Sequence, residues 1–380
     1  MNQIITSIIP YLSKLKIQIS INKKLNKIYS NTSNYSTDEM IERKYKELWS
    51  QFRCRPSLKF LRSMIAISGI SSYEYVPETI QYTILEPVLN NRTYAFAYND
   101  KNFFERYLGN FADLFPKTIF RVQYGTFYDE KYNRIDNDLC VKKLMELPLD
   151  EDLILKPSIE TGGGSNVILI KHINDKYEVQ KQIFTAKEIL SFMKDYNYGN
   201  CILQERLKQH QWFEQFNITS LNTLRLYVYR SVQDDMVHPL SAYIRFGRKG
   251  SLVDNSSQGG FTMGVNLSGL TNNFYITRYG KKITEDEILK MTSQKFVPNF
   301  QEFISYAENI APYFLHHRLL GFDFTVDSNG RTRILEINNL YIGIINQQMN
   351  NGALYGPYLY EILDYGKQHY KSYSYHFYKR

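Results

Sequence analysis

Two carboxylates and a side-chain amide lie at a spacing that suits metal binding. Asp323 and Glu336 each lie in a short apolar run, thirteen positions apart, and residues 327–330 (Asp-Ser-Asn-Gly) between them are a turn signature. The stretch is therefore predicted to form a β-hairpin with one acid on each strand. Asn338 follows Glu336 by two residues, and alternate residues of a strand share a face. The sequence predicts a patch of three oxygen-bearing side chains.

Oxygen ligands of this kind suit Mg²⁺, which proteins usually hold through one or two carboxylates together with substrate phosphates. The hairpin is therefore predicted to carry half of a metal and nucleotide site. Taken alone, the same hairpin is also compatible with a surface turn that carries solvated acids. The segments upstream decide between these interpretations.

A lysine and a glycine-rich turn form the next candidate site. Lys156 ends an apolar strand predicted over 152–156, three glycines occupy 162–164, and Ser165 precedes a second apolar strand. Glycines let backbone N–H groups approach phosphate oxygens, and a lysine adds a point charge. The segment is not a Walker A loop, because its lysine precedes the glycines. A flexible hairpin turn is the alternative.

Three further positions are candidates for a nucleotide site. Lys101 falls in the first turn of a helix predicted to begin at 98–101, where the helix dipole favours anions, so it is a phosphate ligand or a solvated lysine. The short strand 201–207 ends in Gln204 and Glu205, whose backbone could meet a purine edge. Glu205 is equally compatible with a solvated strand end.

Arg225 lies in a segment that alternates its faces. Leu224, Leu226 and Val228 share one side of the predicted strand, so Arg225 projects from the other side. Its planar guanidinium suits a phosphate or a carboxylate. The polar, glycine-rich loop 254–260, which includes Asn255, is predicted to be a substrate or γ-phosphate loop or an ordinary hairpin connection.

The bulk properties are those of a soluble protein with an anionic partner. The 380 residues are 43% hydrophobic and 22% charged, with a formal net charge of +8 and a pI near 9.0. No apolar run reaches the roughly 18 to 20 residues that span a bilayer. Three widely spaced cysteines, Cys54, Cys140 and Cys201, show no metal-binding or CxxC pattern. They favour reduced core residues in a cytosolic protein.

The elements that must position these residues fall into five predicted segments. Residues 1–35 are a basic amphipathic segment without the order of a secretory signal; it is expected to pack on its own domain, and peripheral membrane attachment is the alternative. Residues 36–98 are predicted to form a small α/β subdomain, 99–207 a subdomain with the glycine-rich loop, and 208–350 a subdomain with the metal triad. Residues 351–380 are expected to form a helix and a Tyr/Lys-rich tail.

Several local signals support this division. Capping boxes at 36–39, 185–188 and 284–287 predict three helix starts, the first leading to a helix through Phe52. A further helix is predicted from Asn299 with a kink at Pro312. His316 and His317 are adjacent and so are poor joint metal ligands.

In this order, the parts over about residues 98–348 resemble the ATP-grasp superfamily. Residues 222–225 (Asn-Thr-Leu-Arg) and the loop 254–260 resemble its sugar-transfer-associated group. The resemblance implies an α/β (α+β) fold with the nucleotide bound between two α+β subdomains. It also implies ATP and Mg²⁺ as cofactors.

The resemblance assigns a role to each candidate. Lys101 and Lys156 are implied to bind ATP phosphates, and Arg225 with Lys156 to act in catalysis. The loop from Glu160 through Gly162, Gly163, Gly164 and Ser165 is implied to fold over the phosphates, with Asn255 also near the nucleotide. Gln204, Glu205 and Leu207 fall where the family holds adenine, and Asp323, Glu336 and Asn338 match its metal ligands. Two segments depart from the family pattern: 204–206 in the adenine hinge, and 339–343 in place of a Pro-Gly turn.

The function implied by the resemblance is an ATP-dependent carboxylate–amine ligase that acts through an acylphosphate. The expected substrates are a carboxylated sugar or an amino acid, in surface polysaccharide synthesis, and an amine. The expected location is cytoplasmic or peripheral to the membrane, with a glycan-assembly contact through the basic termini as an alternative and no nucleic-acid partner. A kinase acting on a hydroxyl, and a non-catalytic basic protein that binds glycan or nucleic acid, remain alternatives.

Overall fold

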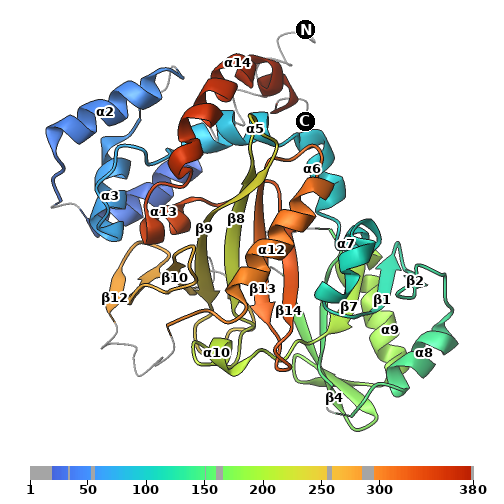
Figure 1. The fold of residues 1–380 in the computed structure, drawn as a ribbon. Helices are drawn as coiled ribbons and strands as arrows, with labels where there is room; N and C mark the ends of the chain where they lie inside the picture. The colour runs from blue at the N-terminus through green and yellow to red at the C-terminus, as the bar shows by residue number, and fades with distance from the viewer. Residues whose placement is uncertain are drawn as a thin grey trace.

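Two antiparallel sheets of seven strands each form the centre of the molecule (Figure 1). The computed structural model describes residues 19–32, 35–52, 56–149, 151–159, 166–254, 259–284 and 295–377. The strands follow the order β2-β1-β7-β3-β4-β5-β6 in the first sheet and β12-β11-β10-β9-β8-β13-β14 in the second. This arrangement of two sheets with covering helices confirms the predicted α+β class.

The first sheet is covered by two helices. Its strands are β1 (Thr118–Gln123), β2 (Thr126–Tyr128), β3 (Leu153–Pro157), β4 (Ile168–Ile173), β5 (Lys176–Val179), β6 (Gln182–Phe184) and β7 (Cys201–Glu205). Helices α8 (Asn137–Met145) and α9 (Ala186–Asp195) share an apolar cluster with β1, β3 and β7. The predicted capping box of Thr185 and Glu188 starts α9, as expected.

The second sheet is buried on both faces along two neighbouring interior strands, β8 and β13. Its strands are β8 (Thr223–Arg230), β9 (Val237–Phe246), β10 (Phe261–Val265), β11 (Phe274–Thr277), β12 (Lys282–Thr284), β13 (Leu319–Val326) and β14 (Thr332–Asn338). Every residue of β8 and β13 is buried. Leu224, Leu226 and Val228 pack with α12 (Phe300–Ile310), whereas Tyr227 and Tyr229 pack with helices on the other side. Because both faces are covered, Arg225 is buried even though it points away from the apolar side.

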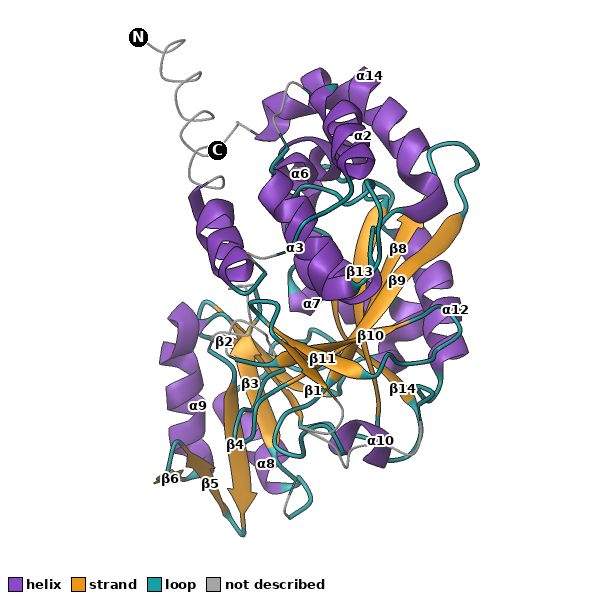
Figure 2. Cartoon of the chain, turned by 90° about the vertical axis from the view of Figure 1, so that its left-hand side faces the viewer, coloured by secondary structure: helices purple, strands orange, loops and turns teal. Residues whose placement is uncertain are grey.

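The helices on the far side come from both ends of the chain (Figure 2). They are α2 (Glu39–Ser50), α3 (Leu58–Ser68), α4 (Glu78–Ile80), the π-helix η1 (Gln81–Leu85), α5 (Glu86–Leu89), α6 (Arg92–Tyr98), α13 (Ile345–Asn351) and α14 (Leu359–Phe377). Trp49, Leu61, Leu85, Met349 and Ile362 are buried together in their shared core. The predicted C-terminal helix is therefore present and docks against the N-terminal helices.

The prediction of strands within 36–98 was wrong. The described part of this segment forms helices joined by loops and contains no strand, because its apolar runs bury one side of short helices rather than alternate faces of a strand. Pro77 stands immediately before α4, where no helical N–H is required, and Pro87 follows the π-helix η1 within one continuous helical run over 78–89. The cap before α2 is Asp38, which accepts a hydrogen bond from the backbone of Met40, rather than the predicted Ser36.

The N-terminal helix and two of the cysteines are buried as predicted, whereas the predicted kink at Pro312 is absent from the described residues. A helix over residues 19–30 buries Ile21 and Ile28, as expected for a segment that packs on its own domain. Helix α12 ends at Ile310, and Pro312 lies in a separate 3-10 turn rather than at a kink. Cys140 and Cys201 are buried free thiols. Residues 1–18, Cys54 and the proposed caps of 285–287 lie outside the described residues.

None of the described helices has both the length and the apolar composition that crossing a bilayer requires.

Candidate functional site

The two predicted phosphate lysines lie side by side because two elements are tied together at their ends. On β3, Leu153, Leu155 and Pro157 are buried, so Lys156 projects from the opposite face. Lys101 is the first residue of α7 (Lys101–Tyr107), and its backbone N–H donates to the carbonyl of Ser158 at 2.9 Å, just beyond β3. The chain segments that carry the two ammonium groups are therefore fixed against each other.

The electrostatics of Lys156 reflect this environment. Burial, followed by the nearby positive charge of Lys101, lowers the pKa of Lys156 to about 8, against the opposing influence of Glu336 and Glu105. A buried cation beside another cation is unfavourable unless an anion joins them. The pair is thus suited to receive a strongly anionic group such as a phosphate chain.

Strands β13 and β14, which carry Asp323 and Glu336, form the predicted hairpin, here called the acidic hairpin, and it contains a β-bulge. Strands β13 and β14 pair so that Asp323 lies directly opposite Glu336, but Phe324 lies opposite Ile334, which leaves Leu335 without a partner. This β-bulge changes the alternation of β14. Ile334 and Ile337 are buried in the core, whereas Leu335, Glu336 and Asn338 are all half-buried on the other face.

The acidic hairpin and the lysine pair meet. The Glu336 carboxylate lies 3.9 Å from the ammonium of Lys101, joining residues that are 235 positions apart in the sequence. The influence of Glu336 on the pKa of Lys156 places all three groups in one neighbourhood. Lys101, Lys156 and Glu336 are therefore near one another, although they come from three different elements.

Asp323 is buried and engaged by two arginines. Nη2 of Arg225 lies 2.9 Å and Nη1 of Arg245 3.1 Å from Asp323 Oδ2, and Nε of Arg225 bonds to Oδ1. Burial alone would raise the pKa of Asp323, but the two guanidinium groups hold it below its usual value. Arg245 also pairs with Asp254 at 2.6 Å. Asp323 is therefore a stable carboxylate within a chain of alternating charges.

The side-chain oxygens of this hairpin suit a divalent cation in part. Glu336 is 30% exposed, and the amide nitrogen of Asn338 faces Asp323 Oδ2 at 3.4 Å, so the amide oxygen of Asn338 is free to face elsewhere. The Glu336 carboxylate and the Asn338 amide oxygen suit Mg²⁺, which completes its shell with water and phosphate, whereas both oxygens of Asp323 are already engaged by Arg225 and Arg245. Among the described residues, no group of three or more His, Cys, Asp or Glu side chains is arranged to hold a metal ion.

A cavity of 1030 Å³ lies between the two sheets. Its lining includes Lys156 and the predicted adenine residues Gln204, Glu205 and Leu207. Ile154 from the first sheet and Leu335 from the second add apolar walls. The volume is at the upper end of the range of about 300 to 1,000 Å³ that is typical of small-molecule sites. Arg225, Lys101 and the metal triad lie outside this lining.

The two residues at the end of β7 differ in what they offer a ligand. The Glu205 carboxylate accepts hydrogen bonds from the backbone of Lys117 at 2.8 Å and from Arg333 at 2.7 Å, so it joins the two sheets and is already occupied. Gln204 donates from Nε2 to the carbonyl of Pro116, and its Oε1 is buried without a hydrogen-bond partner in the described part of the chain. Gln204 thus lines the cavity and carries a buried acceptor that has no hydrogen-bond partner among the described residues.

Six predicted nucleotide residues cannot be placed. Glu160, Gly162, Gly163, Gly164, Ser165 and Asn255 lie outside the described residues. Their neighbours are informative, since Val167 and Asp254 both line the cavity.

Sequence reasoning assigned no role to several residues that the structure brings to this site. Arg245 extends the charge chain from Asp323 to Asp254, the first residue of the predicted substrate loop, and Arg333 contacts both Glu205 and Asp327. Arg333 precedes Leu335 by two residues, and alternate residues of a strand share a face, so the sequence pattern could have placed Arg333 beside Leu335. Nothing local in the sequence indicated that Arg245 lies opposite Thr223 on the neighbouring strand.

Two sheets that enclose a cavity, with a lysine pair and an acidic hairpin at one end, have the architecture of the ATP-grasp class. The chain belongs to the family described as sugar-transfer associated ATP-grasp, whose profile matches residues 81–362. The predicted family membership is therefore confirmed. The comparison with curated proteins gave no match.

The solved structures that resemble this chain are distant. D-alanine–D-alanine ligase from Bacillus anthracis is 12% identical, with a TM-score of 0.38, 72% of this chain covered and 69% of the other. N5-carboxyaminoimidazole synthetase from Staphylococcus aureus is 11% identical, with a TM-score of 0.38 and 70% of this chain covered. This chain spans about half (51%) of the length of that synthetase.

Proposed function

We propose that the protein is an ATP-dependent carboxylate–amine ligase that works through an acylphosphate. The observation that carries the proposal is the meeting of Lys101, Lys156 and Glu336 beside a cavity of nucleotide size. Two cations next to a carboxylate can bind the phosphates of a nucleotide and the divalent cation that accompanies them.

The nucleotide is proposed to lie with its base between the two sheets. Ile154 and Leu335 provide apolar surface from opposite sides of the cavity, which suits the faces of a purine. Gln204 lines the cavity, and its side chain is proposed to turn the unpartnered, buried Oε1 toward an exocyclic amino group such as that of adenine. The triphosphate then runs toward Lys156 and Lys101.

Glu336 and Asn338 are proposed to hold Mg²⁺, with Asp323 completing the predicted triad. When bound, the cation would neutralise charge on the phosphate oxygens. Arg225 is proposed to position Asp323 rather than to contact the nucleotide, because its guanidinium already binds that carboxylate. The chain of Arg225, Asp323 and Arg245 fixes the position of charges beside the reacting groups before substrate arrives.

The chemistry needs activation because a carboxylate is a poor electrophile. A carboxylate oxygen attacks the γ-phosphorus, the bond to the bridging oxygen breaks, and ADP leaves. The amine nitrogen then attacks the acyl carbon, phosphate leaves and a proton is released. Lys101 and Lys156 stabilise charge on the transferring phosphoryl group and hold it in line, so positioning and electrostatics account for the protein's contribution.

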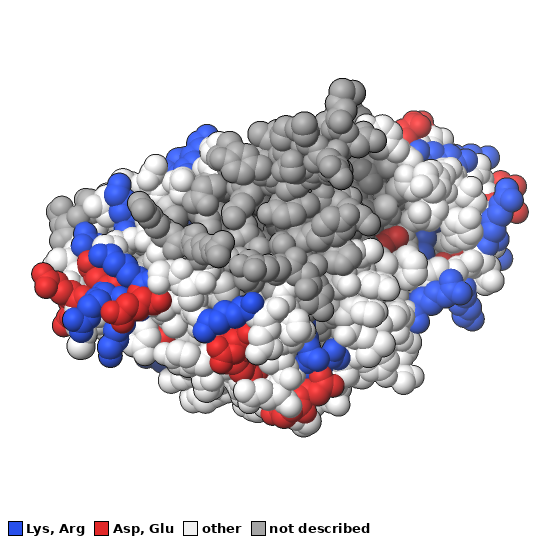
Figure 3. All heavy atoms as spheres, turned by 90° about the horizontal axis from the view of Figure 1, so that it is seen from above, with Lys and Arg blue, Asp and Glu red and all other residues white. Residues whose placement is uncertain are grey.

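The substrate is proposed to be a sugar acid or an amino acid of surface polysaccharide synthesis. The family description, which links these proteins to sugar transfer, supports this proposal. The +8 charge of the chain suits an acidic substrate. On the face seen in Figure 3, basic and acidic side chains of the described residues are interspersed, unlike the continuous basic stripe of a nucleic-acid-binding surface.

The test is ADP release by the full chain with ATP, Mg²⁺, a panel of uronic and amino acids, and an amine. We expect turnover that requires both an acid and an amine, with an amide product detected by mass spectrometry. Lys156→Ala and Glu336→Ala should each abolish turnover, and Lys171→Ala, an exposed lysine on β4, should not. Unchanged turnover in both site variants would refute the site, and a phosphorylated hydroxyl product would identify a kinase.

A further inference from the structure

The short helix α5 carries two fully buried polar side chains that contact the end of the acidic hairpin. Glu86 is the first residue of this helix, and Asn90 follows its last residue. The backbone N–H of Glu86 donates to the carbonyl of Gln81, five residues earlier, which closes the π-helical turn η1. Single π-helical turns are frequent at functional sites. The family match begins at residue 81, so this turn and α5 lie within it.

Asn90 ties the two strands of the acidic hairpin together at their open end. Its Nδ2 donates to the carbonyl of Leu319, the first residue of β13, at 2.7 Å and to that of Asn339, just beyond β14, at 2.8 Å. Its Oδ1 accepts from the backbone of Arg318 at 3.0 Å and of Leu319 at 2.9 Å. A side-chain amide can donate two hydrogen bonds and accept two, so the capacity of Asn90 is filled.

Glu86 holds the loop that follows β14. Its Oε1 accepts a hydrogen bond from the backbone N–H of Tyr341 at 2.8 Å, and its Oε2 accepts one from Ile342 at 3.0 Å. Burial raises the pKa of Glu86 to about 7, against the opposing influence of Arg92, whose Nη2 lies 3.7 Å from Oε1, and of the two N–H groups. At pH 8 the group is therefore a carboxylate that can accept both hydrogen bonds.

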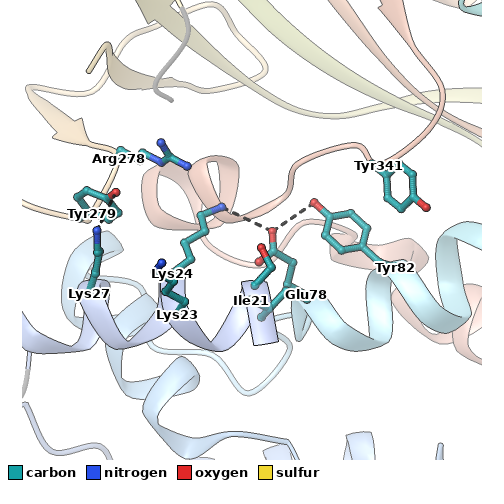
Figure 4. A pocket seen from close by; sticks show the side chains of 10 residues that line it. Ile21, Lys23, Lys24, Lys27, Glu78, Tyr82, Arg278, Tyr279 and Tyr341 are labelled. Carbon is teal, nitrogen blue, oxygen red and sulfur yellow. Dashed lines mark hydrogen bonds and ion pairs between the residues drawn. The ribbon is translucent and has the colours of Figure 1, made fainter. Parts of the chain in front are cut away.

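The backbone of Tyr341 adopts a conformation that needs such support. Its φ of 51° lies in the left-handed region, which is uncommon for a bulky side chain. The Arg92 guanidinium lies 4.8 Å from the centre of the Tyr341 ring, and the ring of Tyr82 meets it edge to face at 5.9 Å, at the side of a 400 Å³ pocket (Figure 4). Strained backbone persists only where the surrounding structure determines it firmly. The loop is thus held in one shape.

The side chain of Asn338, by contrast, is weakly held by its own contacts. Its Nδ2 lies 3.3 Å from the carbonyl of Gly321 and 3.4 Å from Asp323 Oδ2, beyond the usual range of about 2.7 to 3.2 Å. The next residue, Asn339, is fully buried, and its carbonyl is fixed by Asn90. The backbone beside Asn338 therefore does more to set its position than the hydrogen bonds of its side chain.

We infer that Glu86 and Asn90 are positioning residues for the proposed metal site. They fix the backbone on the C-terminal side of Asn338 and so hold its amide oxygen near Glu336 before a cation arrives. Because both are fully buried, they act through the loop and not by contact with the nucleotide. Ligands held in place beforehand bind more tightly, because less conformational freedom is lost on binding. This inference rests on the proposed function for the role of Asn338 as a metal ligand.

The test measures binding of the non-hydrolysable ATP analogue AMP-PNP to the full chain by isothermal titration at pH 8, with Mg²⁺ and again with EDTA. We expect Mg²⁺ to increase the affinity of the wild type. Glu86→Gln, whose amide can accept only one of the two hydrogen bonds, and Asn90→Ala should each weaken binding at least tenfold in Mg²⁺ and less than twofold in EDTA. Only the cation-dependent part of the affinity requires Asn338.

Trp49→Phe is the matched control for a loss of stability alone. It trims a buried side chain of α2 in the same helical core, so it should lower the Tm and leave the ratio of the two affinities unchanged. A Mg²⁺ effect as large in the Glu86 and Asn90 variants as in the wild type would refute the inference and leave the proposed function standing. A wild type without any Mg²⁺ effect would refute the proposed metal site, and the positioning role with it.

Hydrogen exchange of the wild type tests the same inference without a variant. The backbone amides of Tyr341 and Ile342 should be protected in the ligand-free protein, because Glu86 already binds both. Rapid exchange that slows only when AMP-PNP and Mg²⁺ are added would show that the loop is not held beforehand, and the inference would be overturned.

Discussion

The buried positive charge of Lys156 destabilises the folded, ligand-free protein, and a bound nucleotide would stabilise this charge. Burial lowers its pKa to about 8 from 10.5, so the unfolded chain binds more protons than the folded chain between these values. We expect Lys156→Met to raise the Tm of the ligand-free protein below pH 8, with a gain that fades toward pH 10.5. The same variant should lose the stabilisation that Mg²⁺ and ATP give the wild type. Thermal unfolding across pH measures both effects, and a lower Tm at pH 7 would contradict the argument.

The same lysine predicts proton uptake on nucleotide binding. Near pH 8.5 a large share of Lys156 is neutral in the free protein, and triphosphate oxygens would favour its charged form and raise its pKa. Calorimetric titration with ATP in two buffers of different ionisation enthalpy should therefore show uptake of a fraction of a proton. Lys156→Arg, which is always charged, should show none. Equal uptake in both proteins would assign the proton to another group.

The Asp323 carboxylate is expected to be structural as well as functional. Asp323→Ala would leave the buried guanidinium groups of Arg225 and Arg245 without their shared partner. Breaking a buried pair in this way costs about 3 to 5 kcal/mol. Urea unfolding should show this loss, whereas Glu146→Ala, which removes an exposed partner of Lys142, should change stability by less than about 0.5 kcal/mol. A small effect of Asp323→Ala would mean that water reaches both arginines.

At the scale of the element, the bulge in β14 decides which side chains face the nucleotide. Leu335 lines the cavity, whereas its neighbour Ile334 is fully buried in the core. Leu335→Ala should raise the KM for ATP by about tenfold, equivalent to about 1.4 kcal/mol of lost apolar contact, with kcat unchanged. Stability should change little.

Ile334→Ala is the matched control for this prediction. It should cost about 2 to 5 kcal/mol of folding stability, measured by urea unfolding. The protein that remains folded should keep a KM for ATP close to that of the wild type. If the two variants exchanged these effects, the register of β14 would be shifted by one residue and the bulge would lie elsewhere.

At the scale of the whole molecule, the site exists only when both sheets are in place. Lys156 comes from the first sheet and Glu336 from the second, and Arg333 joins them through Glu205. A nucleotide that bridges the sheets should stabilise the whole chain, by about 2.7 kcal/mol at a ligand concentration of 100 times Kd. We expect ATP with Mg²⁺ to raise the Tm and EDTA to remove most of the gain. Equal stabilisation with and without EDTA would argue against a bound cation.

Much of the local structure was predictable because it depends on neighbours in the chain. The hairpin with its 327–330 turn, the alternation that exposes Lys156, and the capping box of α9 depend on short-range periodicity and on local hydrogen bonds. The same reasoning failed for 36–98, where apolar runs interrupted by prolines fit short helices as well as strands. Tertiary packing against α13 and α14 selected the helices.

By itself, the sequence determined which residue types are available and in which order, and this was enough to indicate the family. The tertiary structure alone decided that Asp323 is enclosed by Arg225 and Arg245, that Glu205 joins two sheets, and that a bulge places Leu335 beside Glu336 on one face. The physical reason is that these contacts join strands from distant parts of the chain. Their register is set by packing over the whole sheet rather than by any local pattern.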